Sequence, residues 1–289
     1  MVDSVIAQGL RLALWDHAPT RTDLPLVLCV HGALDTGRSF DAIAGELEGK
    51  ARVVAVDLRG HGSSDHVGVG GSYHLLDFLK DLAFVVDALK PISVLVGHSM
   101  GGNLALMLAG SVPSCTQALL LVDAVGPPGE EGSEQPERIG ELLRTLLEPK
   151  RAFAPVKTIE EGIARMQKWN PGLKDAAAHL MLEPVLRDVD GGLEFPFDPR
   201  LRGPTPFRFS DDTWQAFARR VTAQTTIVRA SDGFVPGGDV EGTLGDPFEA
   251  RARLMKAKVV VVEGTHHLHV ERPAALAQEI LSLCKSSTD

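Results

Sequence analysis

The sequence predicts an α/β protein with a mostly parallel sheet, helices on both faces and an inserted helical cap. Two observations support this prediction: short apolar runs alternate with helical stretches, and the alternation stops between about residues 126 and 220. Nearly continuous runs of Val, Ile and Leu are typical of parallel strands that are covered on both faces. The runs are Leu26–Val30, Val53–Val56, Val94–Val96, Leu119–Val122, Thr225–Val228 and Val259–Val262.

The start of the chain and its middle depart from this pattern. Val5–Ala7 and Leu10–Trp15, joined near Gly9, predict a hairpin at the edge of the sheet. Residues 126–220 show no β pattern that would give them a sheet of their own, so we interpret them as a cap over the C-terminal edge of the strands. The core is then residues 1–125 and 221–289. Within the cap, helices are expected around Ile139–Leu147, Ile159–Lys168 and Leu173–Leu186, followed by loops over Phe195–Phe209.

Composition narrows the class of protein. The chain has 289 residues, 44% of them apolar, and a formal net charge of −9 without a run of Lys and Arg, so nucleic acid is not an expected partner. Its three widely spaced cysteines predict no disulfide framework and favour a reducing compartment. We find no leader pattern and no window of about 18 apolar residues that could cross a bilayer. We therefore expect a cytoplasmic protein that acts on a small molecule, and these features are compatible with a homodimer.

Ser99 lies in a sequence that predicts an exposed nucleophile. The apolar run Ile92–Val96 leads into Gly97-His98-Ser99-Met100-Gly101-Gly102 and then into the helical stretch Asn103–Leu108. A G-x-S-x-G sequence between a strand and a helix puts the serine on a strained turn, and the glycines let neighbouring backbone approach closely. The start of the helix also favours developing negative charge. Ser99 is therefore the candidate nucleophile.

A second buried strand ends in His31-Gly32, and its turn predicts part of an oxyanion hole. The backbone N–H of Ala33 or Leu34, together with that of Met100, is expected to bind the developing oxyanion. His31 is interpreted mainly as a structural histidine that bridges loops and shapes this hole.

The third turn, which follows Val53–Val56, contains Asp57, Arg59 and His61. These side chains could be taken for a catalytic pair and its neighbour. We interpret all three as residues that tie loops together.

A nucleophilic serine needs a base, and His266 is the candidate. It follows Val259–Val262 in Gly264-Thr265-His266-His267-Leu268-His269, at the sheet edge where function collects in open α/β sheets. His267 and His269 are alternatives by spacing. We expect no metal here, because the histidine tract lacks a second cluster of carboxylate or Cys ligands.

The base requires a carboxylate that holds its tautomer, and two aspartates compete for this role. Asp232 follows Thr225–Val228, and Asp123 follows Leu119–Val122. We prefer Asp232, because the order Ser99, Asp232, His266 agrees with the order nucleophile, acid, base of this type of fold.

Together these segments resemble the α/β-hydrolase superfamily, and the resemblance covers nearly the whole chain outside the cap. Four ordered landmarks support it: His31-Gly32, Asp57–Gly62, Gly97–Gly102, and Gly264-Thr265-His266 leading to Glu271-Arg272-Pro273. In the family the catalytic histidine precedes a Glu-x-Pro segment by about this distance, which favours His266. Within the superfamily, Phe197–Leu201 and Arg229–Gly233 are similar to the serine hydrolase-like subfamily.

The resemblance implies a serine hydrolase that needs no cofactor and forms an acyl-enzyme on Ser99. Carboxylic esters are the first expectation; a lactone or the C–C bond of a β-diketone would use the same residues, and a non-catalytic receptor is the rival from another class. Candidate substrate-binding residues are His31 and His98 beside the turns, and Phe153 and Trp169 in the cap. Other large apolar residues that could line an acyl pocket are Met166, Met181, Phe195, Phe197, Phe207 and Trp214.

Overall fold

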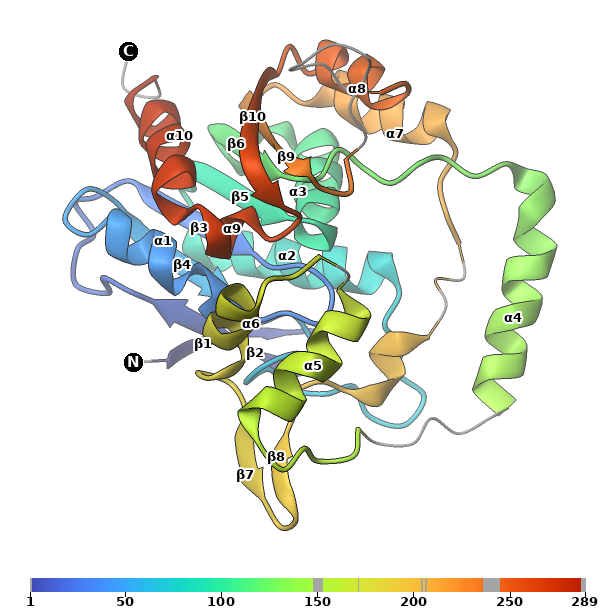
Figure 1. The fold of residues 1–289 in the computed structure, drawn as a ribbon. Helices are drawn as coiled ribbons and strands as arrows, with labels where there is room; N and C mark the ends of the chain where they lie inside the picture. The colour runs from blue at the N-terminus through green and yellow to red at the C-terminus, as the bar shows by residue number, and fades with distance from the viewer. Residues whose placement is uncertain are drawn as a thin grey trace.

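The computed structural model describes residues 2–147, 153–170, 172–203, 205, 207–235 and 245–286. Its centre is an eight-stranded sheet with the strand order β1-β2-β4-β3-β5-β6-β9-β10 (Figure 1). The strands are β1 (Val2–Ala7), β2 (Leu10–Asp16), β3 (Leu26–Val30), β4 (Arg52–Val56), β5 (Val94–His98), β6 (Ala118–Val122), β9 (Gln224–Asp232) and β10 (Lys258–Thr265). All six predicted apolar strands and the N-terminal hairpin are confirmed.

In the sheet order, the strands from β4 to β10 are parallel to one another, and the two antiparallel pairs lie at the N-terminal hairpin and where it joins β4. β1 pairs with β2 and β2 with β4 in antiparallel register, and Gly9 turns the hairpin with φ +83°. The central strands β3, β5 and β6 are buried at every position, because helices cover both faces. All their carboxyl ends therefore meet at one edge of the sheet.

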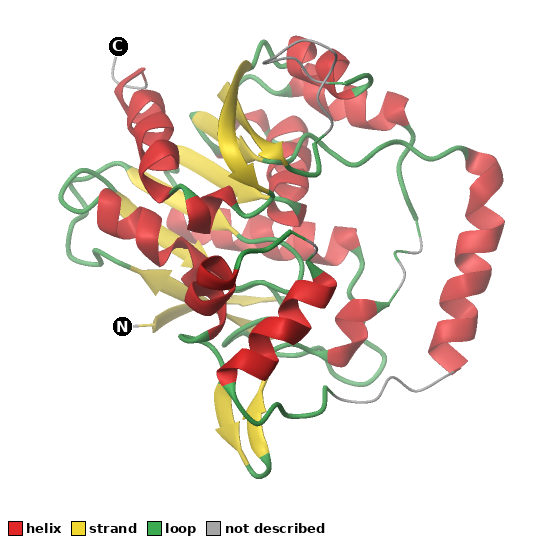
Figure 2. Cartoon of the chain, viewed as in Figure 1, coloured by secondary structure: helices red, strands yellow, loops and turns green. Residues whose placement is uncertain are grey.

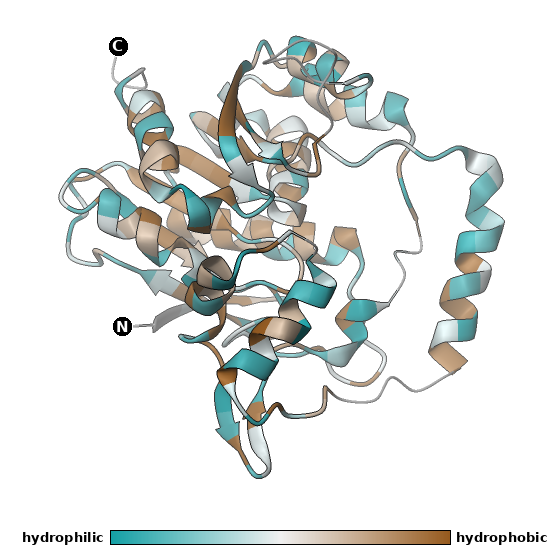
Figure 3. Ribbon diagram, in the orientation of Figure 1, coloured by the Kyte–Doolittle hydropathy of each residue, from teal (hydrophilic) through white to brown (hydrophobic). Residues whose placement is uncertain are grey.

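Two groups of helices form the layers above and below the sheet (Figure 2). One core contains residues of α2 (Leu75–Leu89), α3 (Met100–Ser111), α7 (Asp211–Arg220) and α8 (Phe248–Leu254). The other contains residues of α1 (Asp41–Glu46), α9 (Leu268–Glu271) and α10 (Pro273–Ser286). The apolar strands lie between these layers, as the hydropathy colouring shows (Figure 3). Short 3-10 helices are η1 (Gly37–Phe40), η2 (Pro113–Cys115), η3 (Gly132–Glu134) and η4 (Pro199–Arg202).

The inserted segment contains three helices and a small hairpin. They are α4 (Gln135–Leu147), α5 (Ile159–Trp169), α6 (Asp175–Leu182), β7 (Arg187–Val189) and β8 (Gly192–Glu194). The helix expected over Leu173–Leu186 is thus shorter at both ends. The two-stranded sheet was missed because each strand has only three residues.

The helix α7 lies within the predicted cap range but packs on the core. It contacts α3 and α8, and its Trp214 is 1% exposed in the core cluster beneath the sheet. Trp214 is therefore a packing residue and lies outside the acyl pocket that the sequence suggested for it.

The buried guanidinium of Arg251 in α8 holds both ends of the insertion. Its Nη1 donates to the carbonyl oxygens of Val125, Gly126 and Pro127 at 3.0, 2.8 and 2.8 Å. Its Nη2 donates to Asp211 at 2.5 Å, at the start of α7. One side chain thus fixes where the chain leaves the core and where it returns.

Across the described residues, no helix is long and apolar enough to span a membrane. Cys29, Cys115 and Cys284 are all free thiols. Cys29 is fully buried in β3, as its apolar sequence context predicts.

Candidate active site

Ser99 occupies the turn between β5 and α3, the strand–turn–helix context predicted for it. Its backbone has φ 52° and ψ −119°, a conformation that non-glycine residues rarely adopt. The flanking glycines allow this turn, because a Cβ on Gly101 would lie 2.2 Å from the carbonyl oxygen of Val30. A Cβ on Gly97 would lie 2.5 Å from the carbonyl oxygen of Gly101. The turn therefore packs directly on the end of β3.

The imidazole of His266 is hydrogen-bonded to Asp123. The Nδ1–H of His266 donates to Oδ2 of Asp123 at 2.5 Å, and the carboxylate is fully buried. The backbone N–H of Phe234 donates to the same oxygen at 2.7 Å, and that of Ala230 donates to Oδ1 at 3.2 Å. Asp123 follows β6 with φ 46°, so the turn directs its side chain toward these donors.

Asp232, the preferred acid of the sequence analysis, does not contact His266. Asp232 is exposed, and its carboxylate accepts a hydrogen bond from the Ser231 hydroxyl at 3.4 Å. The physical reason is the length of β9, which runs to Asp232 in register with Thr265 of β10. The expected Asp232–His266 contact is therefore wrong, and Asp123 takes that position.

A glycine gives the signal that could have identified Asp123. The chain turns back after β9 at Gly233 so that the N–H of Phe234 reaches the carboxylate. A Cβ on Gly233 would lie 2.4 Å from both carboxylate oxygens of Asp123. The glycine after Asp232 thus makes room for the other aspartate.

Ser99 and His266 border the same two cavities. The first has a volume of 220 Å³ and is also bordered by Ala33, Trp169 and Met181. The second, of 280 Å³, extends along Asp123 to Phe248. A third cavity of 360 Å³ lies under α4, where Leu142 and Leu146 face Phe78 and Met100. Ala33 and Leu34 line both this third cavity and the first.

The backbone N–H groups beside Ser99 are not equally available. The N–H of Leu34 donates to Nε2 of His61 at 3.2 Å, so it is already occupied. Burial, and then the neighbouring His31, lower the pKa of His61 to about 3, so that its ring is neutral and can accept this bond. Among the hydrogen bonds of the described residues, none uses the N–H of Ala33. The N–H of Met100, at the first position of α3, has no acceptor within the helix.

His31 is structural on both sides of its ring. It is fully buried, its Nδ1–H donates to the carbonyl oxygen of Gly32 at 2.7 Å, and its Nε2 accepts from Leu58 N–H at 3.0 Å. This agrees with its interpretation as a bridge between loops. The sequence also counted it among substrate-binding residues, and that assignment is wrong because no ring nitrogen remains for a ligand.

The other turn residues also tie loops, as expected. The carboxylate of Asp57 accepts from Gly37 N–H at 2.7 Å, from Ser63 N–H at 2.8 Å and from the Trp15 indole at 3.0 Å. The guanidinium of Arg59 forms a buried ion pair with Asp81 in α2, with an Nε–Oδ2 distance of 2.5 Å.

Of the remaining predicted substrate contacts, His98 and Trp169 border the 220 Å³ cavity. Phe153 is 6% exposed and packs behind Trp169, with ring centroids 5.1 Å apart. It supports the wall of the cavity instead of forming it.

The loop that carries His266 is fixed by the residue that the family pattern singles out. Glu271 accepts from the backbone N–H of Thr265 at 2.9 Å and from its hydroxyl at 3.0 Å. The carboxylate thereby sets the path of the chain just before His266.

A cluster of buried histidines that the sequence did not predict lies beside His266. His98, the last residue of β5, lies close to His267 and His269, which are distant from it in the sequence. Its Nε2–H donates to the carbonyl oxygen of His266 at 2.9 Å. Sequence spacing alone could not bring His98 to this tract, because the two are adjacent only in the folded sheet.

A serine after β5, a histidine after β10 and an aspartate after β6, on this sheet, define the class of α/β hydrolases. A family model described as "Alpha/beta hydrolase family" matches residues 27–279, and the chain belongs to this family. A serine hydrolase-like protein of Danio rerio is 30% identical over 88% of this chain and 79% of its own length. A 3-hydroxybutyrate-oligomer hydrolase of Cupriavidus necator is 34% identical over 86% of this chain and 80% of its own. A hypothetical protein of Pseudomonas aeruginosa PAO1 has a solved structure with a TM-score of 0.83, at 27% identity, covering 100% of this chain and 99% of that one.

Proposed function

We propose that this hydrolase cleaves carboxylic esters through an acyl-enzyme on Ser99, with His266 as base and Asp123 as acid. One observation carries the proposal: Asp123 binds Nδ1–H of a histidine that borders the same cavities as Ser99. Donation from Nδ1 leaves Nε2 of the neutral ring with a lone pair, the form needed to accept the serine proton. The fold and the family support hydrolysis, and the ester and the acyl-enzyme are the finer steps proposed.

The proposed reaction has two halves. Oγ of Ser99 attacks the carbonyl carbon while its proton passes to Nε2 of His266, and Asp123 stabilises the imidazolium. The oxyanion accepts hydrogen bonds from the N–H groups of Ala33 and Met100. The alcohol leaves with the proton from His266. His266 then takes a proton from water as the water oxygen attacks the acyl carbon. It passes this proton to Oγ of Ser99 as the acyl–oxygen bond breaks, which releases the acid and regenerates the free serine.

The cavities support a substrate of small to medium size. The 220 and 280 Å³ cavities that Ser99 and His266 border have room for the two sides of a small ester, and the 360 Å³ cavity under α4 shares Ala33 and Leu34 with the first of them. Leu142 and Leu146 give the larger cavity apolar walls. The relative named as a hydrolase of 3-hydroxybutyrate oligomers supports the same bond class, because such oligomers join carboxyl and hydroxyl groups.

The test is turnover of p-nitrophenyl acetate and butyrate together with labelling by a fluorophosphonate. We expect a burst of p-nitrophenol, and a label on the peptide that contains Ser99. Ser99→Ala should abolish both, with a loss in kcat of about 10⁶ as for the best-studied serine nucleophile. Ser111→Ala, at the other and exposed end of α3, is the matched control and should retain full activity.

Three results would overturn parts of the proposal. Full activity of Ser99→Ala would remove the nucleophile. A labelled Ser99 that turns over only lactones or β-diketones would reject the ester. A chain that is neither labelled nor active, yet binds such compounds, would be a receptor of this fold.

A further inference from the structure

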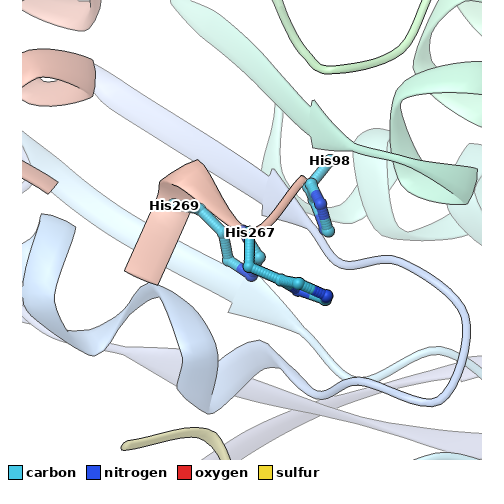
Figure 4. A group of neighbouring side chains, drawn as sticks. All are labelled: His98, His267 and His269. Carbon is cyan, nitrogen blue, oxygen red and sulfur yellow. The ribbon is translucent and has the colours of Figure 1, made fainter. Parts of the chain in front are cut away.

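Three buried histidines lie next to the proposed catalytic histidine, and Figure 4 shows their side chains gathered in one place between the end of β5 and the start of α9. His98 ends β5, His267 precedes α9, and His269 lies in α9. One potential coordinating nitrogen from each lies within 4.8 Å of the others. They are 1%, 6% and 0% exposed.

Each of these three rings has a nitrogen, Nδ1, that takes part in no hydrogen bond with the residues that the structure describes. Within the described part of the chain, the Nδ1 atoms of His98, His267 and His269 are buried without a hydrogen-bond partner. Histidines in an apolar core normally satisfy their nitrogens, so three unpartnered atoms in one cluster call for a cause. Coordination of an ion would provide one.

On His98 and His269 the opposite nitrogen, Nε2, has the kind of partner that metal-binding histidines usually have. Nε2–H of His98 donates to the carbonyl oxygen of His266 at 2.9 Å, and Nε2–H of His269 donates to the carboxylate of Asp35 at 3.1 Å. Such outer hydrogen bonds fix the tautomer and turn the other nitrogen toward a metal.

From this geometry we propose that His98, His267 and His269 bind one divalent transition-metal ion, with Zn²⁺ as the probe of choice. Imidazole nitrogen suits zinc, copper and nickel, and three histidines with one open position match a four-coordinate zinc site. His98 and His267 border the 220 Å³ cavity that Ser99 also borders. The ion therefore reaches its ligands through that cavity, where water fills the fourth position.

Binding has a consequence for the neighbouring base. The rings of His98 and His266 lie 4.7 Å apart, centroid to centroid. A dication on His98 opposes the positive charge that His266 gains when it accepts the serine proton. The ion is thus an inhibitor of hydrolysis. This consequence rests on the proposed function, whereas metal binding itself does not.

The first measurement is direct binding to the intact, EDTA-treated chain. We expect Zn²⁺ to bind with one equivalent by calorimetry, and Co²⁺ to give the visible absorption of a four-coordinate site. His267→Gln removes a ligand and should weaken Zn²⁺ at least 10-fold. Asp35→Asn changes the partner of His269 and keeps the three proposed ligands, and it should weaken Zn²⁺ binding about 10- to 100-fold. The carboxylate of Asp35 also accepts from Thr36 N–H and the Ser39 hydroxyl and lies 3.9 Å from Nδ1 of His98. Circular dichroism and the melting temperature show whether each variant is folded.

The matched control is His179→Gln. His179 is exposed on α6 and lies 3.3 Å from Glu183, a surface pair that could bind zinc weakly. Its loss should leave the one-equivalent site unchanged. The proposal is overturned if no stoichiometric binding is seen, if folded His267→Gln binds as the wild type does, or if His179→Gln removes the site. Zinc that binds as expected without slowing ester turnover would overturn the inhibition alone.

Discussion

At the residue scale, the carboxylate of Asp123 is held in a fixed position by three hydrogen-bond donors. It accepts from His266 and from the backbone N–H groups of Phe234 and Ala230, and it is fully buried. Backbone donors of this kind hold the oxygen that faces His266 in place. The same geometry allows a sharp choice between the two aspartates.

We expect Asp123→Asn to lower kcat for p-nitrophenyl esters by about 10⁴. This is the loss seen in a serine protease when the aspartate that binds the catalytic histidine becomes an amide, because the histidine then adopts the wrong tautomer. Asp232→Asn is the matched control, because that side chain is exposed at the end of β9. It should keep near wild-type turnover. If Asp232→Asn were the inactive variant and Asp123→Asn the active one, the assignment of the acid would be reversed.

The glycines that flank Ser99 in the turn between β5 and α3 allow a second prediction at this scale, which concerns stability. A Cβ on Gly101 would lie 2.2 Å from a backbone oxygen of β3, which cannot move without shifting the strand. Gly101→Ala should therefore destabilise the protein by about 1–3 kcal/mol in urea unfolding. Gly140→Ala in α4, where the nearest atom is a flexible Arg144 nitrogen at 3.6 Å, should be neutral or stabilising by up to about 1 kcal/mol. Equal effects of the two changes would contradict the packing argument.

At the scale of elements, the strands could be predicted well and their partners poorly. Runs such as Leu119–Val122 are apolar at every position because both faces of the sheet are covered, and this pattern is local in sequence. The end of β9 is not local, since it depends on pairing with β10, so Asp232 was expected to be at a loop and is in a strand. The contact of Leu34 N–H with His61 and the approach of His98 to His269 likewise depend on the packing of separate elements.

The helix α8 provides a prediction at the same scale, because its Arg251 holds the insertion at both ends. Arg251→Met leaves three carbonyl oxygens and the half-exposed Asp211 without this partner, so unfolding should become easier by about 1–3 kcal/mol. Arg253→Met on the same helix loses one exposed pair with Glu249 and should cost less than about 0.5 kcal/mol. If urea denaturation gives a similar loss of unfolding free energy for both variants, the hydrogen bonds of Arg251 to the two ends of the insertion stabilise the protein no more than an exposed ion pair does.

For the molecule as a whole, the buried histidines link stability to pH. Burial is the main cause that lowers the pKa of both His61 and His267 to about 3, and neighbouring histidines lower it further. In the unfolded chain these groups titrate near 6.5. Between pH 6.5 and about 3 the unfolded chain therefore binds protons that the folded chain excludes, and stability falls as pH falls. Above 6.5 both states are neutral at these positions and the contribution is complete.

Each of these histidines should lower the free energy of unfolding by about 1 kcal/mol per pH unit below 6.5. Urea titrations at pH 7.5, 6.5, 5.5 and 5.0, with EDTA present, measure this slope. His267→Gln removes one such group and should flatten the slope by about 1 kcal/mol per pH unit. His179→Gln removes an exposed histidine and should leave the slope as it is. Burial opposes protonation of these rings in the folded state, because a charged imidazole there would lose its hydration. A wild-type stability that stays constant from pH 6.5 to 5.0 would contradict this prediction, because the rings would then take up protons in the folded chain as well.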